Sequence, residues 1–246
     1  MIAVIGRGNF GRALLRLLNT HLADWETESL DKAPDSSRIP NIDILRRARV
    51  VIPAVPIASF GEVLRQIAPF LQPGTIVIDV CTIKAHTARQ MHSLLPEHVE
   101  LIACHPLFGP ESLAAAGWQL KGLNLVIWAE RIQAERYDRI REGLRDLGLN
   151  VIELSPQDHD RILARSQFLS LLIGAVLVRM DIQSTEMNTR SFDELLDVRD
   201  TTCHDYGILR DVFRFNSACD ATLAELEKTL GDIGAELRKS RLPGPG

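Results

Sequence analysis

The sequence predicts an α/β protein in which a doubly wound, mainly parallel sheet is followed by an all-helical C-terminal region. Three observations predict this class. Short apolar runs alternate with amphipathic segments up to residue 154, as strands alternate with helices in such folds. A glycine-rich turn separates the first apolar run from the first amphipathic segment. After Pro156 no further strand is convincing, and the chain reads as helices.

The expected elements follow from the spacing of apolar residues. Strands are expected over residues 1–5, 25–30, 49–52, 75–80, 101–104, 124–128 and 151–154. Helices are expected directly after the glycine-rich turn, over 57–71, over a segment that ends at residue 95, and over 134–147, 158–180, 184–198, 203–215 and 219–237. We therefore expect a first domain over residues 1–154, a helical domain over 155–240 and a disordered tail over 241–246, where Pro and Gly alternate.

The composition is that of an ordinary globular protein. The chain has 246 residues, of which 46% are hydrophobic and 24% charged, and its net charge of -4 gives no support to nucleic-acid or anionic-membrane partners. No apolar run is expected to span a bilayer, and the strand-like start leaves no signal peptide. The cysteines lack metal spacing and are far apart, which favours a reducing, cytoplasmic location and no metal site. They are Cys81, Cys104, Cys203 and Cys219.

The glycine-rich turn reads Gly6-Arg7-Gly8-Asn9-Phe10-Gly11, a G-x-G-x-x-G pattern that follows a strand and opens a helix. Gly6 permits the tight turn, Gly8 lets a pyrophosphate approach the backbone, and Gly11 lets helix and strand pack closely. Free N–H groups at the start of the helix then face the phosphates. We predict a Rossmann-type dinucleotide site at these six residues; the alternative is a glycine-rich turn of another α/β protein.

The second strand is expected to end in the acid that holds the adenosine ribose. Asp31 lies about 20 residues after the turn, where that acid is expected, and this favours NAD. Lys32 and Arg38 would instead suit a 2′-phosphate, so NADP is the alternative. Val55 and Pro56, in the proline-rich exit of the third strand, are expected beside the ribose or nicotinamide of the cofactor.

The segment His105-Pro106-Leu107-Phe108-Gly109-Pro110-Glu111-Ser112 follows the fifth strand. A titratable side chain followed by Pro, Gly and Pro is poor material for a core, so we predict a loop that leaves the strand and holds a ligand. Because ligands bind outside the carboxyl ends of parallel strands, His105 is expected near Gly8, Val55 and Thr82. The alternative for His105 is a hydrogen-bonded loop histidine.

This histidine segment, with Gly117-Trp118, resembles the signature of the prephenate and arogenate dehydrogenases, especially the plant-type arogenate enzymes. Residues 79–84 are similar to a conserved segment of that family, with Thr82 in the place of its serine. Further matches are His159-Asp160-Arg161, Ser166-Gln167-Phe168, and Asn188-Thr189 followed by Phe192, Leu195 and Leu196. The resemblance covers nearly the whole chain.

The resemblance implies oxidative decarboxylation of a cyclohexadienol to a phenol, with hydride transfer to the nicotinamide of NAD or NADP. His105 is then the base that accepts the hydroxyl proton. Thr82 is expected to orient that imidazole or to hydrogen-bond the same hydroxyl. The candidates for substrate contacts are Ser112, Arg165, Ser166, Gln167, Asp193 and Arg210.

The chain departs from the family at two places. Gln167, Ser170 and Leu171 stand where relatives carry histidines on the first C-terminal helix. Asp193 stands where many bacterial members carry an arginine that helps to grip a substrate carboxylate. An acid repels a second carboxylate and suits an amine, which favours arogenate over prephenate; the alternative is that Asp193 faces solvent.

Other functions stay open at this point. The 3-hydroxyacid dehydrogenases join similar domains, but their chemistry resembles a lysine-assisted hydride transfer, and no lysine lies between Lys121 and Lys228. A non-catalytic NAD-binding regulator is a second alternative. A specialised dehydrogenase that acts on an arogenate-like compound of secondary metabolism is a third.

The helical region is too thin to stand alone. Residues 167–178 are apolar on nearly all sides, which predicts a helix buried on several sides, so we expect a homodimer through this domain. His159 and His204 are expected to be surface or capping residues, and Trp118 and Trp128 to serve packing.

Overall fold

The computed structural model describes residues 1–33, 38–202 and 206–240. The chain forms two compact units, Met1–His159 and Asp160–Gly246. The expected disordered tail, Cys203 and His204 lie outside the described residues.

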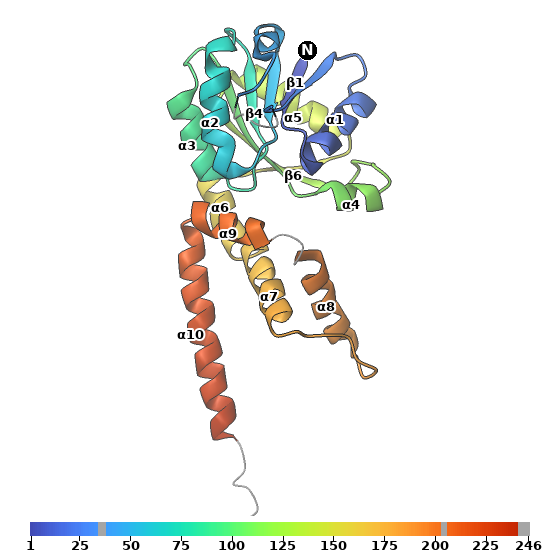
Figure 1. The fold of residues 1–246 in the computed structure, drawn as a ribbon, viewed down its shortest axis with the longest axis vertical. Helices are drawn as coiled ribbons and strands as arrows, with labels where there is room; N and C mark the ends of the chain where they lie inside the picture. The colour runs from blue at the N-terminus through green and yellow to red at the C-terminus, as the bar shows by residue number, and fades with distance from the viewer. Residues whose placement is uncertain (34–37, 203–205, 241–246) are drawn as a thin grey trace, which may run out of the picture. The chain divides into compact units, whose positions relative to one another are not determined.

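The first unit is built on a seven-stranded sheet with the order β2-β1-β3-β4-β5-β6-β7 (Figure 1). All neighbouring strands are parallel except β5 and β6, which run antiparallel. The sheet is therefore mainly parallel, as the sequence predicts. The strands are β1 (Ile2–Ile5), β2 (Thr27–Leu30), β3 (Val50–Pro53), β4 (Ile76–Asp79), β5 (Glu100–Pro106), β6 (Asn124–Arg131) and β7 (Asn150–Glu153).

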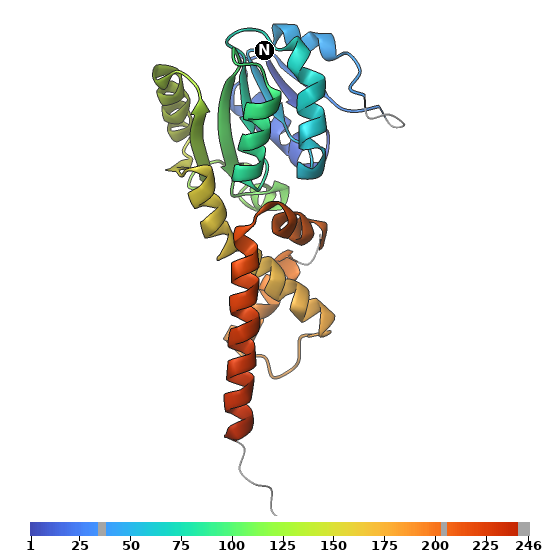
Figure 2. The same cartoon turned by 90° about the vertical axis from the view of Figure 1, so that its left-hand side faces the viewer.

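Helices cover both faces of this sheet (Figure 2). They are α1 (Asn9–His21), α2 (Ile57–Ile67), α3 (Lys84–Leu94), α4 (Pro110–Ala115) and α5 (Ala134–Asp146). The first unit also contains the short 3₁₀ segments η1 (Ile42–Arg47) and η2 (Ala68–Phe70), and α6 (Pro156–Ala164) begins after β7. Apolar residues of α1, α4 and α5 form one core with β4, β5 and β6. Helices α2 and α3 pack side by side on the opposite face. This doubly wound arrangement leaves the carboxyl ends of β1, β3 and β4 as the edge where ligands bind.

The predicted loop after the fifth strand is shorter than expected. Strand β5 continues through Pro106, and α4 begins at Pro110. His105 therefore lies within the strand and is buried, with only 5% of its surface exposed. The expectation of a loop histidine was wrong because Pro106 still pairs with Leu125 on the antiparallel neighbour β6.

The second unit consists of helices α7 (Gln167–Arg179), α8 (Arg190–Thr202), α9 (Tyr206–Phe215) and α10 (Ala218–Lys239), while α6 spans the division between the units. The single helix expected over 158–180 is two helices. They are separated at Ser166, whose hydroxyl donates to the carbonyl oxygen of Ile162 at 2.8 Å and so competes with regular helix bonding. Helix α8 starts later than expected because Thr189 caps it by accepting the N–H of Phe192.

Helix α7 buries one side within its own chain. Phe168 stacks on Phe213 of α9 with ring centroids 5.9 Å apart, and Gly174 lies directly against Thr202 of α8. Val176 and Val178 stay exposed. The expected burial on several sides is thus not reached in one chain.

The segment Pro156–Arg179 is long and apolar enough, by length and composition, to cross a membrane. The expectation that no run reaches this length was wrong on that criterion. The segment is interrupted at Ser166 and partly buried, and the core helix of a soluble protein meets the same criterion. It is weak evidence for a membrane span.

Candidate active site

The glycine-rich turn joins β1 to α1 in a form that only glycine permits. Gly6 has φ +108°, and a Cβ there would overlap the carbonyl oxygen of Ala54. A Cβ on Gly11 would overlap the carbonyl oxygen of Gly6. At Gly8, by contrast, no heavy atom lies within 4 Å of the Cβ position. Gly6 and Gly11 thus close the turn, while Gly8 leaves one side open at the start of α1, where backbone N–H groups attract anions.

A cation lies beside this turn. The guanidinium of Arg12 donates to the carbonyl oxygen of Arg7 at 2.5 Å and to Oδ1 of Asn9 at 2.8 Å. A positive charge next to a helix start favours a phosphate ligand. Arg12 was not among the predicted site residues, although its position one residue after the glycine motif was a usable signal.

Asp31 reaches the turn from the end of β2. Its Oδ2 accepts the backbone N–H of Arg7 at 2.9 Å, and its Oδ1 accepts the N–H of Lys32 at 2.8 Å. The Arg7 side chain is directed to β2, where Nε donates to Oγ of Ser29 at 2.8 Å. The predicted ribose acid and the predicted phosphate loop are therefore neighbours.

The loop after β3 closes the other side of the turn. Strand β1 lies between β2 and β3, so the chain order reverses there, and ligands of doubly wound sheets bind at this switch point. The N–H of Ala54 bonds the carbonyl oxygen of Ile5 at 2.7 Å, and the Val55 side chain lies against Gly6. Pro56 follows at the start of α2 and is exposed. Val55 and Pro56 are thus placed at the predicted cofactor edge.

A buried ion pair lies between β4 and β5. Nζ of Lys84 is 2.5 Å from Oδ2 of Asp79 and also 2.5 Å from the carbonyl oxygen of Cys104. Thr87 donates a further hydrogen bond to Asp79 at 2.5 Å. Thr82 is half-buried in the turn between β4 and α3. A charge pair in such a dry site requires several hydrogen bonds, and these are present.

His105 meets a second histidine. Its Nδ1 is 2.9 Å from Nε2 of His159, and the two rings are nearly perpendicular, with centroids 5.1 Å apart. Only 4% of the surface of His159 is exposed. The expectation that His159 is a surface or capping residue was wrong, because α6 folds it against β5, 54 residues away in the sequence.

Burial decides the charge of His105. Loss of solvent lowers its pKa well below the usual 6.5, and the ammonium of Lys84 and the ring of His159 lower the pKa further. His105 is therefore neutral at pH 7, which is the protonation state that a general base requires.

The predicted substrate contacts have local partners. Ser112 exchanges hydrogen bonds with Gly109 at the start of α4. In the second unit, Ser166 and Gln167 are exposed at the start of α7, and Asp193 accepts from Nδ2 of Asn188 at 2.6 Å. The remaining two candidates interact with residues that are not predicted substrate contacts. Arg210 lies 6.0 Å from the ring centroid of Tyr206, and Arg165 forms an ion pair with Glu225. Their role toward a substrate stays a prediction.

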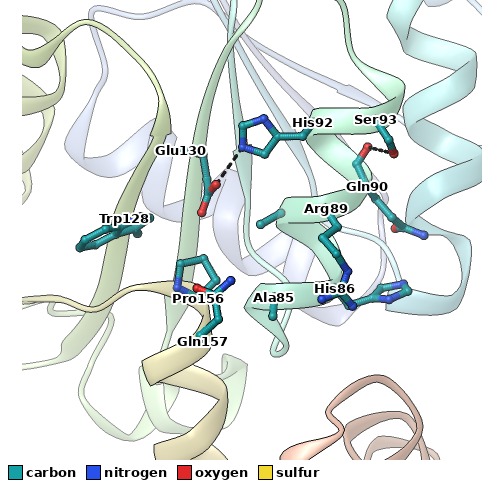
Figure 3. A pocket seen from close by; sticks show the side chains of 11 residues that line it. Ala85, His86, Arg89, Gln90, His92, Ser93, Trp128, Glu130, Pro156 and Gln157 are labelled. Carbon is teal, nitrogen blue, oxygen red and sulfur yellow. Dashed lines mark hydrogen bonds and ion pairs between the residues drawn. The ribbon is translucent and has the colours of Figure 1, made fainter.

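A cavity of about 690 Å³ lies between α3, β6 and the start of α6 (Figure 3). His92 and Glu130 are hydrogen-bonded in its wall, with Nε2 and Oε2 2.9 Å apart. Trp128 also lines it and is 37% exposed, so its packing role stays a prediction, whereas Trp118 packs against the core as expected. The lining residues include none of those predicted for cofactor or catalysis.

The open glycine turn and the adjoining acid define a protein of the Rossmann-type dinucleotide-binding class, and the buried neutral histidine lies on β5 of the same sheet. Among the described residues, no group of three or more His, Cys, Asp or Glu is placed to hold a metal ion.

Comparison with known proteins shows the family. The family model "Prephenate dehydrogenase, nucleotide-binding domain" matches residues 19–132. Arogenate dehydrogenase 2, chloroplastic, of Arabidopsis thaliana is 30% identical over 252 residues, which are 96% of this chain and 69% of that protein. The chain belongs to the prephenate and arogenate dehydrogenase family.

One more relative agrees, and two solved structures share the fold. Arogenate dehydrogenase 1, chloroplastic, of the same plant is 28% identical over 99% of this chain, and the chain spans only 40% of its length. The structure of Synechocystis arogenate dehydrogenase shares the fold with a TM-score of 0.70 at 17% identity, covering 97% of this chain and 92% of that one. Aquifex aeolicus prephenate dehydrogenase in complex with hydroxyphenyl propionate and NAD+ gives 0.74 at 16% identity, covering 97% and 90%. Residues 176–242 also match the family model "TYRAAT1-like, C-terminal domain".

Proposed function

We propose that the protein oxidatively decarboxylates arogenate to tyrosine, with NAD as hydride acceptor and prephenate as a poorer substrate. The observation that carries this proposal is His105, a buried neutral imidazole near the carboxyl end of β5, in a chain of this family. The relatives named arogenate dehydrogenase support the substrate class.

The reaction follows from the chemistry of the ring. When bound, NAD accepts the hydride from the ring carbon that bears the hydroxyl. His105 takes the hydroxyl proton as that carbon is oxidised, and carbon dioxide leaves from the opposite ring carbon as the ring becomes aromatic. The proton then returns from His105 to the phenolate oxygen. The protein's contribution is to position the base, orient the ring and exclude water. We expect Thr82, in the turn that follows the neighbouring strand β4, to share in the orientation.

The preference for arogenate rests on Asp193. Arogenate carries an ammonium on its side chain, where prephenate carries a keto group, and a carboxylate attracts the former. We expect Asp193→Asn to lower the ratio of kcat/KM for arogenate to that for prephenate. Glu194→Gln, one residue further along α8, is the matched control. If the ratio of the two kcat/KM values is unchanged in Asp193→Asn, Asp193 faces solvent and does not contact the substrate.

The preference for NAD rests on Asp31. A carboxylate that lies against the phosphate turn suits the ribose hydroxyls and repels a 2′-phosphate. We expect Asp31→Ser to weaken NAD binding and to improve the relative use of NADP. Equal use of both cofactors by the unaltered protein would contradict this part of the proposal.

We also propose a homodimer through the helical unit. Helix α10 carries apolar residues at alternating steps of four and three, the spacing of a helix–helix seam. The apolar residues near the start of this helix pack within the chain. Leu230, Ile233 and Leu237, further along the helix, are 59%, 47% and 64% exposed. A second copy of the same helix would cover them. Light scattering should give a dimer for the unaltered protein and a monomer for Ile233→Arg, with Asp232→Arg as control; a monomeric unaltered protein refutes it.

A reducing compartment such as the cytoplasm suits the thiols. Cys81, Cys104 and Cys219 are free and buried, and burial raises the pKa of Cys104 to about 12. Such thiols stay protonated and unreactive. Cell fractionation tests the location.

The experiment that tests the reaction is a spectrophotometric screen of arogenate and prephenate, each with NAD and NADP. We expect reduction of NAD with arogenate and less with prephenate. If neither compound yields reduced cofactor although NAD binds, the proposed reaction is refuted.

A further inference from the structure

We propose that His159 is a positioning residue for His105, and that it does so by accepting a hydrogen bond from Nδ1–H of His105 through its own Nε2. This inference rests on the proposed function, because it concerns the form in which His105 acts as a base. The geometry that supports it is the 2.9 Å distance between these two nitrogens and the burial of both rings.

The direction of this hydrogen bond decides whether His105 can act as a base. A neutral imidazole carries one proton, so one nitrogen donates and the other accepts. If Nδ1 of His105 carries the proton, its Nε2 presents a lone pair and can take a proton from a hydroxyl. If His159 donates instead, the proton of His105 sits on Nε2, and that nitrogen has no lone pair to offer.

Action of His105 as a base requires the first arrangement. An N–H group that is removed from water needs an acceptor, or the protein loses the hydrogen-bond energy of that group. Among the described residues, the partner of Nδ1 is Nε2 of His159. A base-competent His105 therefore depends on His159 as acceptor, in the way that an acceptor behind a catalytic histidine fixes its tautomer in hydrolases.

The first turn of α6 holds His159 in place. Ser155 caps the helix, with its Oγ accepting the N–H of Asp158 at 3.2 Å, and Pro156 opens the first turn. The backbone N–H of His159 donates to the carbonyl oxygen of Ser155 at 2.9 Å. The ring thus stands on the capped first turn of the helix, at 74° to the His105 ring and with its Nε2 2.9 Å from Nδ1 of His105.

The pair changes during the reaction. When His105 gains the hydroxyl proton it becomes an imidazolium, and its Nδ1–H then forms a charge-assisted hydrogen bond to Nε2 of His159. This bond is stronger in the charged state than in the resting one, so it stabilises the step in which the proton is held. His159 itself need not touch substrate.

Two variants of His159 test the idea by activity. His159→Phe keeps a buried ring but has no acceptor, and we expect kcat with arogenate to fall about 100-fold, with KM and the Kd of NAD changed less than threefold. His159→Gln offers a carbonyl oxygen near the position of Nε2, and we expect it to recover at least about tenfold over His159→Phe. His98→Phe, which replaces another hydrogen-bonded histidine of the first unit, is the matched control and should keep full activity.

The tautomer tests the idea without activity. In the full-length protein labelled with ¹⁵N-histidine and saturated with NAD, the side-chain NMR spectrum at pH 7 should show His105 protonated on Nδ1. The signal of His105 is identified as the one that is missing from the spectrum of His105→Gln. A proton on Nε2 overturns the inference, and so does a His159→Phe variant that folds and keeps kcat within threefold. If the unaltered protein turns over neither substrate, the proposed function fails, while the tautomer still decides this inference.

Discussion

The glycine turn offers a sharp separation between folding and cofactor binding. Gly8→Ala and Gly11→Ala add the same methyl group three residues apart, yet their surroundings differ. At Gly8 the Cβ position is empty to 4 Å, and the backbone there, with φ -64° and ψ -176°, is one that alanine adopts. At Gly11 the new atom would overlap the carbonyl oxygen of Gly6.

The magnitudes follow from these surroundings. Gly8→Ala should change the free energy of unfolding by less than about 1 kcal/mol, since a small gain in chain entropy opposes a small loss at the helix cap. Its Cβ would stand where the pyrophosphate approaches, so NAD affinity should fall at least about tenfold, or about 1.4 kcal/mol. Gly11→Ala forces backbone apart and should lower stability by about 1–3 kcal/mol, a fall in Tm of about 2–4 °C for each kcal/mol.

Two measurements on the same samples decide the matter. Thermal unfolding followed by circular dichroism gives the stabilities without ligand, and calorimetric titration with NAD gives the affinities. A Gly8→Ala protein that unfolds normally and binds NAD within twofold of the unaltered protein would refute the phosphate role of the turn. A Gly11→Ala protein of normal stability would refute the close approach of α1 to β1.

Two further predictions concern buried charge. The unfolded chain protonates His105 near its usual pKa of 6.5, while the folded protein resists protonation. The free energy of unfolding should therefore fall with decreasing pH below 6.5, by up to about 1.4 kcal/mol per pH unit. In urea unfolding at pH 7 and 5.5, His105→Gln should lose this part of the pH dependence; the same pH dependence in both proteins would count against a depressed pKa of His105. Lys84→Met should destabilise the protein by about 3–5 kcal/mol, because it leaves Asp79 buried without its cation. The double variant Lys84→Met with Asp79→Leu should recover part of that loss. If Lys84→Met alone lowers the free energy of unfolding in urea by less than about 1 kcal/mol, the pair is dispensable.

The first half of the fold could be read from the sequence because its signals are local. The apolar run before Gly6 and the amphipathic residues after Gly11 specify β1, the turn and α1 within a few neighbouring residues. The position of Asp31 against Arg7 followed from the same supersecondary unit. The antiparallel pairing of β5 with β6 was not foreseen, because a buried antiparallel strand has the same apolar pattern as a parallel one.

The site was only half predictable for a similar reason. His105 stands in a conspicuous segment, whereas His159, although its segment resembles the family, shows no apolar periodicity or spacing that separates it from a surface histidine at a helix start. Their contact depends on how α6 returns to β5, which periodicity does not encode. Lys84 was likewise passed over as a site residue, although a lysine that follows a buried strand and an aspartate was a usable sign of a buried pair.

The central claim is that His105 takes the substrate proton. Its most direct test is the initial rate of NADH formation from arogenate at saturating NAD, measured side by side for the unaltered protein, His105→Gln and the control His98→Gln. The account predicts a fall in kcat of at least about 100-fold for His105→Gln, with the Kd of NAD unchanged and the control fully active. A His105→Gln enzyme that retains kcat within tenfold of the unaltered protein would contradict it.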